Sequence, residues 1–186
     1  MSRSPRAEFI AVALVVPIIL PVFAYLTVAM LDGHGIGGAV SALVAQIRDG
    51  RPNPLITGIL GLLPVLLLLL GMWIGRRFDP EGRRIAAAGW GGLGGILVVL
   101  AWVNLTVWPL YLPGRPFPGF PHGLELVIGP ILFAPVAGVL GVGIGWLAGK
   151  RGRTAVVIVA GLALAGVTTA LIAGVWGGFL GRDPLA

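Results

Sequence analysis

Five long apolar stretches make up nearly all of this chain, and clusters of basic residues separate them. The stretches cover approximately residues 9–31, 54–75, 85–112, 124–149 and 154–180. Each has at least about 20 residues, enough to cross a hydrocarbon core of ~30 Å as an α-helix. Because every backbone polar group in lipid must bond within its own segment, helices are the expected form. We therefore predict an all-α, polytopic integral membrane bundle of five transmembrane helices, a single domain over residues 1–186.

Composition supports a membrane protein and excludes several other classes. Only 11% of the residues are charged, whereas a soluble domain is typically about 25% charged. There is no cysteine, which excludes disulfides, thiolate metal sites and iron–sulfur clusters. The net charge is +6, but the basic residues lie at the ends of the apolar stretches and form no nucleic-acid motif. We expect membrane lipids as partners, and no nucleic acid.

The distribution of basic residues predicts the orientation. If the N-terminus is inside, the inner segments contain nine of the thirteen basic residues and the outer segments four. The positive-inside rule then predicts an N-in, C-out arrangement, in what we expect to be a bacterial cytoplasmic (inner) membrane. The first stretch is too long for the core of a signal peptide, so we expect it to be retained. The residues of the two inner loops that set topology and meet anionic lipid are Arg76, Arg77, Arg83, Arg84, Lys150, Arg151 and Arg153.

The first outer segment contains an additional helical pattern. Val40, Leu43, Val44 and Ile47 follow the i, i+3, i+4, i+7 spacing of one apolar helix face. We predict a short helix that lies in the outer membrane interface. The alternative is a helix packed onto the bundle, and the sequence does not separate the two.

Small and polar residues predict how the helices pack. Gly141, Gly145 and Gly149 recur at spacing four, a GxxxG pattern that forms a face where another helix backbone approaches closely. Asn104 is expected to face a neighbouring helix and bind it, with a contribution of roughly 0.6–2 kcal/mol. Five tryptophans near span ends are interpreted as interfacial anchors. They are Trp73, Trp90, Trp108, Trp146 and Trp176.

Prolines inside the stretches predict kinks, since each removes a backbone donor. They are Pro17, Pro21, Pro64, Pro130 and Pro135, and the first two are expected to distort their helix most. A functional hinge lining a cavity is one interpretation, and a static kink absorbed by neighbours is the favoured one. The spacings Gly58–Pro64 and Gly129–Pro135 are both six, which suggests a weak internal repeat or a coincidence.

The two histidines of the chain both fall on the outer side in this topology. Asp32 and His34 follow the first stretch, and His122 and Glu125 open the fourth. Two imidazoles and two carboxylates could hold a zinc, copper or iron ion, or form a proton-entry site. The alternative is that they are solvated loop residues, with Glu125 favoured by the dipole at a helix N-terminus.

The function is weakly determined, because no ionisable residue lies near the middle of any stretch and no catalytic motif is present. No cofactor can be identified, and an enzyme is the less favoured interpretation. We favour a non-catalytic accessory subunit that packs against other integral membrane proteins or against itself. The alternatives are a small oligomeric transporter or channel, and the outer-face metal or redox site.

Overall fold

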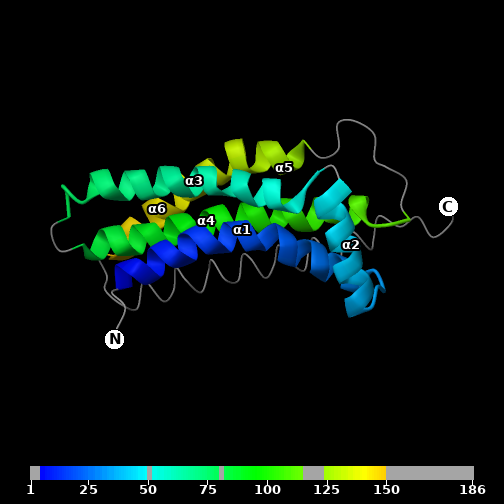
Figure 1. The fold of residues 1–186 in the computed structure, drawn as a ribbon. Coiled ribbons are helices and arrows are strands. Elements are labelled where there is room, and N and C mark those ends of the chain that lie inside the picture. The colour runs from blue at the N-terminus through cyan, green and yellow to red at the C-terminus, as the bar shows by residue number, and fades with distance from the viewer. Residues whose placement is uncertain (1–4, 50–51, 80–81, 115–123, 150–186) are drawn as a thin grey trace.

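A computed structural model describes residues 5–49, 52–79, 82–114 and 124–149, and its regular structure there is entirely helical. The elements form an elongated bundle with one short helix across one end (Figure 1). In chain order they are α1 (Pro5–Leu31), α2 (Ile36–Asp49), α3 (Pro54–Gly75), α4 (Arg83–Val107), η1 (Trp108–Tyr111), α5 (Glu125–Ile128), η2 (Gly129–Phe133) and α6 (Ala134–Gly149).

Four helical segments of the described chain are long and apolar enough to span a membrane. They are Arg6–Leu31, Pro54–Gly75, Arg83–Tyr111 and Glu125–Gly149. All four coincide with predicted spans to within about three residues at each end, and the protein is accordingly an integral membrane protein by helix length and composition. The predicted fifth span, 154–180, lies outside the described residues.

The third of these spans is the centre of the bundle. α4 contacts α1, α3 and α6, and 56% of the apolar window of its span is buried, against 22–33% in the other three. Two clusters of buried side chains lie along α4. One gathers around Trp108 and Tyr25 near α2, and the other around Phe9, Leu68 and Leu93.

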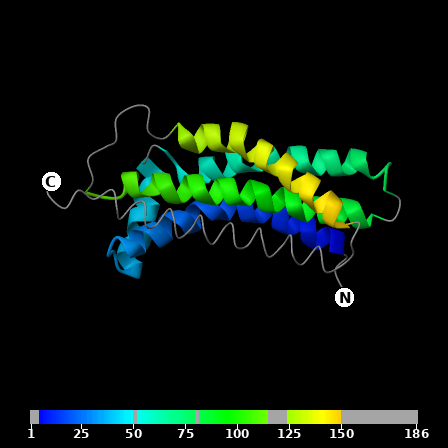
Figure 2. The ribbon, with the colours of Figure 1, turned by 180° about the vertical axis from the view of Figure 1, so that it is seen from behind.

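The closest contact in the bundle joins α4 to α6, which lie side by side in Figure 2. A Cβ built on Gly141 would overlap the carbonyl oxygen of Gly91, and one on Gly91 would overlap that of Gly141. A Cβ on Gly145 would overlap the carbonyl oxygen of Ala87 in the same way, and one on Gly149 would lie 2.9 Å from the Arg84 Cα. The three glycines of the predicted packing face therefore lie against the α4 backbone.

A second close contact joins α1 to α3 at the prolines of α1. A Cβ on Gly58 would lie 2.6 Å from the carbonyl oxygen of Ile18, and one on Gly61 would lie 3.6 Å from that of Pro17. Pro21 has no N–H to bind the Pro17 carbonyl, so this oxygen lacks its usual helical donor. α1 nevertheless runs as one α-helix from Pro5 to Leu31, with Pro17 and Pro21 fully buried.

The strongest departure from α-helical geometry instead lies in the fourth span. Gly129–Phe133 forms a π-helical turn between α5 and α6, and the N–H of Ala134 bonds to the Gly129 carbonyl. Pro130 lies inside this turn and Pro135 follows it. Because neither proline can donate a backbone hydrogen bond, widening the turn is a way to keep the remaining carbonyls paired.

The predicted short helix is present, but only part of its apolar stripe is buried. Leu43 is buried with Ala39 and Ala42 against the bundle, where the Tyr25 hydroxyl donates to the Ala42 carbonyl over 3.4 Å. Val40 and Val44 are exposed. α2 therefore packs onto the bundle, which was the alternative, and its place in the membrane interface stays a prediction.

The α4–α6 contact can be tested with matched alanine substitutions. Gly141→Ala introduces a methyl group against the Gly91 carbonyl, so we expect the free energy of unfolding to fall by about 1–3 kcal/mol. Gly143→Ala, in open space on the same helix, should change it by less than about 0.5 kcal/mol. Equal effects in unfolding measurements in mild detergent would contradict the close α4–α6 contact.

Candidate functional site

Basic residues gather at the end of the bundle opposite α2. Arg6 of α1 and Arg76 after α3 line a small pocket of about 140 Å³ there, together with Asp79. The Asp79 carboxylate accepts hydrogen bonds from the backbone N–H groups of Arg84 and Ile85, at 2.9 and 3.0 Å. This capping fixes the start of α4, and Gly82 completes the turn with a φ of 71° that glycine readily adopts.

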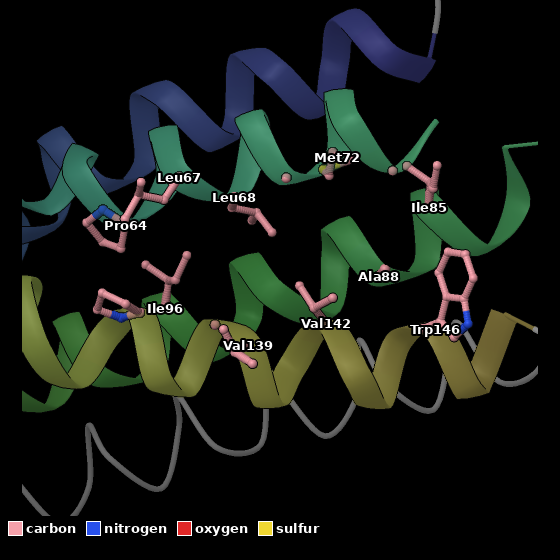
Figure 3. A pocket seen from close by; sticks show the side chains of 14 residues that line it. Pro64, Leu67, Leu68, Met72, Ile85, Ala88, Ile96, Val139, Val142 and Trp146 are labelled. Carbon is pink, nitrogen blue, oxygen red and sulfur yellow. The ribbon is translucent and has the colours of Figure 1, made fainter. Parts of the chain in front are cut away.

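A larger apolar groove of about 370 Å³ opens between α3 and α6, with α4 as its floor (Figure 3). On α3 its lining runs from Pro64 to Gly75, on α4 from Ile85 to Ile96, and on α6 from Pro135 to Trp146. Among the described residues that line it, none is charged, and the indole N–H of Trp146 is the polar group. The groove therefore suits a hydrocarbon ligand rather than an ion or a polar solute.

The basic end and the groove adjoin each other. Met72 and Ile85 line both the small pocket and the groove. The guanidinium carbon of Arg84 lies 5.8 Å from the centroid of the Trp146 ring, and that ring lines the groove. This cation–π contact keeps a positive charge at the mouth of an otherwise apolar groove.

Asn104 is buried, as a polar residue at membrane depth should be, and its hydrogen bonds within the described part of the chain are local. Its amide nitrogen donates to the Leu100 carbonyl at 2.7 Å, and its carbonyl oxygen accepts from the Trp108 indole nitrogen at 2.8 Å. Both partners belong to the same continuous helical segment. That Asn104 also binds another helix stays a prediction, and the fifth predicted span, 154–180, lies outside the described residues.

Trp108 also differs from its prediction. Its ring is fully buried and meets Tyr25 of α1 edge to face, with centroids 5.6 Å apart. It is therefore a core residue and not an interfacial anchor. Trp73 is exposed, as an anchor would be, whereas Trp90 is only 39% exposed and packs edge to face on Phe9.

Two threonines within the described spans, Thr57 and Thr106, also bond locally. The Thr57 hydroxyl donates to the Asn53 carbonyl, and the Thr106 hydroxyl donates to the carbonyls of Trp102 and Val103. These i−4 and i−3 bonds are those that such side chains make inside helices. They leave the groove and the exposed faces apolar.

The structure describes only part of the predicted cluster of Asp32, His34, His122 and Glu125. The His34 Nδ1 lies 3.9 Å from a carboxylate oxygen of Asp32, too far for a hydrogen bond, and it has no hydrogen-bond partner among the described residues. Glu125 begins α5, and His122 lies outside the described residues. Within the described part of the chain, no group of three potential ligands is close enough to hold a metal ion.

The predicted hinge prolines occupy different surroundings. Pro64 and Pro135 line the groove from opposite sides, whereas Pro17 and Pro21 are buried between helices. The groove itself was not predicted from the sequence, since it arises from the divergence of α3 and α6. The pairing of Arg84 with Trp146 was also missed, because 62 residues separate them in the chain.

Comparison with known proteins found no matching family model, no similar curated protein and no similar solved structure.

The local bonding of Asn104 predicts a contrast between two double-mutant cycles. In lipid, separated helices keep their internal bonds, so the Asn104–Trp108 pair should contribute less than about 0.6 kcal/mol of coupling to bundle unfolding. The Tyr25–Trp108 pair crosses between helices and should contribute about 0.5–1.5 kcal/mol. The variants are Asn104→Leu, Trp108→Phe and Tyr25→Leu, singly and in pairs. A larger coupling for the Asn104 pair would show that it does hold helices together.

Proposed function

We propose that this protein is a non-catalytic integral membrane subunit that packs against other integral membrane proteins. The main support is how its intraspan polar groups are used. Asn104, Thr57 and Thr106 all bond locally along their own stretch of chain, and no charged residue lies within 9–31, 54–75, 85–111 or 126–149. The described spans therefore offer no group of the kind that binds an ion or relays a proton at membrane depth.

The helix least covered by the bundle supplies a surface for a partner. α6 has two opposite faces, and Gly138, Gly141 and Gly145 of one face are buried against α4. The other face has an exposed row at spacings of four, three and four, which we call the α6 outer stripe. It consists of Val136, Leu140, Gly143 and Leu147.

The α6 outer stripe has the form of a helix-packing seam. Spacings of four and three keep side chains on one face of a helix, as in knobs-into-holes contacts. Gly143 lies in open space within the row, so a partner backbone could approach closely there. In lipid such close approach drives association, since no hydrophobic force does. We infer that a transmembrane helix of another subunit packs along this row.

The test compares two glycine-to-leucine variants. One places a side chain on the α6 outer stripe, and the other places the same side chain in the groove between α3 and α6. A photo-crosslinking residue at Leu140 should give one discrete adduct with another integral membrane protein in intact membranes. Gly143→Leu should abolish the adduct, whereas Gly71→Leu, which projects into the groove instead, should leave it unchanged. The adduct is measured by gel mobility and mass spectrometry.

Three outcomes of this experiment would contradict the proposal. Adducts with lipid alone, together with a monomer after mild solubilisation, would show that no partner protein binds this face of α6. An adduct that still forms in the Gly143→Leu variant would show that the partner does not bind along the α6 outer stripe. Adducts only between two copies of this chain would favour the oligomeric transporter or channel. Pro64 and Pro135, which line the groove, would then be the hinge positions.

The outer-face metal site is the second candidate, favoured by one observation. The buried Nδ1 of His34 faces the Asp32 carboxylate with no hydrogen bond of its own, which leaves it available to a cation. This candidate predicts stoichiometric zinc, copper or iron in the purified protein and its loss in the His34→Ala and His122→Ala variants. Elemental analysis measures both. An equal metal content in the variants and the parent protein would rule the site out.

A further inference from the structure

The groove between α3 and α6 is the depth of one lipid leaflet. Its end residues are 11 positions apart on each lining helix: 64 and 75 on α3, 85 and 96 on α4, and 135 and 146 on α6. At 1.5 Å per residue the groove is about 16 Å long. Half of a hydrocarbon core of ~30 Å is about 15 Å. The groove therefore begins at the arginine-rich end of the bundle and has a length close to the depth of one leaflet.

The size of the groove distinguishes an acyl chain from a protein helix. The groove is about 16 Å long, whereas a transmembrane helix crosses the whole hydrocarbon core of ~30 Å. A helix laid along the groove would therefore extend well beyond it, whereas an acyl chain spans a single leaflet and matches its length.

Charge marks the end at which a head group would lie. Trp146 lines the groove at this end, and the guanidinium of Arg84 lies over its ring. Arg76 lies in the adjoining pocket, across Met72 and Ile85. The described residues at this end include five arginines (6, 76, 77, 83 and 84) and two acidic groups, Glu8 and Asp79, a formal charge of 5 − 2 = +3. A phosphate at the mouth would meet guanidinium donors.

We propose that the groove binds one anionic glycerophospholipid of the leaflet next to the arginine-rich end. Its acyl chain lies between α3 and α6, and its phosphate binds Arg84 and Arg76. This site is separate from the α6 outer stripe, because Gly71 lines the groove and Gly143 does not.

The first test measures lipid retention by the delipidated full-length protein in mild detergent. Palmitoyl-oleoyl phosphatidylglycerol and phosphatidylcholine are added separately, and bound lipid is counted by native mass spectrometry. We expect phosphatidylglycerol to bind at least about fivefold more tightly, because each arginine near a membrane surface contributes about 1 kcal/mol to the binding of an anionic lipid. Gly71→Leu should lose both lipids, since its side chain enters the groove, whereas Gly143→Leu should retain them. Equal retention by the two variants would overturn the proposal.

The second test separates the head group from the chain. Arg84→Gln and Arg76→Gln should each weaken phosphatidylglycerol binding more than phosphatidylcholine binding, because the choline cation already offsets the phosphate charge, and so should reduce the preference for phosphatidylglycerol. Arg77→Gln is the control, because Arg77 lies at the same end but lines neither cavity. An equal effect of all three would indicate general surface charge and overturn the site. If inorganic phosphate stabilised the protein as much as phosphatidylglycerol does, the site would be a phosphate site and the lipid proposal would be overturned.

The third test locates the acyl chain directly, with a photoreactive lipid bound to the unsubstituted protein and, in a separate arm, a crosslinker within the groove. A phosphatidylglycerol with a photoreactive group midway along one acyl chain should label residues 64–71 and 135–142. Labelling spread evenly over the exposed face of α1 would overturn the proposal. A crosslinker placed at Val139 that captures residues 154–180 of the same chain would also overturn it, since the apolar fifth stretch would then be the occupant.

Discussion

The bundle depends on backbone-to-backbone contact between α4 and α6. In water, apolar helices associate because association removes apolar surface from solvent, but in lipid that driving force is absent. What remains is van der Waals attraction, which is appreciable only where many atoms approach closely. Gly91 and Gly141 provide that approach, since each lacks the Cβ that would overlap the other's carbonyl. α6 is attached to the rest of the described bundle largely through this contact.

The same constraint explains the shape of the groove. α6 is held against α4 and makes few contacts with α3. The two outer helices therefore diverge above α4, and the space between them is apolar because the side chains that line it are apolar. This groove and the exposed face of α6 are the surfaces on which the proposed lipid and the proposed partner helix would bind.

Several features were predictable from the sequence for identifiable reasons. The four described spans follow from uninterrupted apolar runs of sufficient length, because lipid permits only helices there. The face of Gly141, Gly145 and Gly149 follows from their spacing. Asn104 shows where such reasoning stops. Its burial is predictable from its polarity, but its partner is not, because Trp108 four residues later competes with every residue on other helices. The partners of His34 depend in the same way on how the outer segments approach one another.

The sequence by itself determined that the chain is helical and membrane-embedded, and that its basic residues separate from its apolar ones. These properties follow from the solvent and from helix periodicity, and both act locally along the chain. Only the tertiary structure decided that Trp108 is a core residue, that α2 packs on α1, and that Arg84 lies over Trp146 at one end of an apolar groove. Such features depend on which helix faces meet, and many pairings of apolar faces are nearly equal in energy until glycine contacts select one.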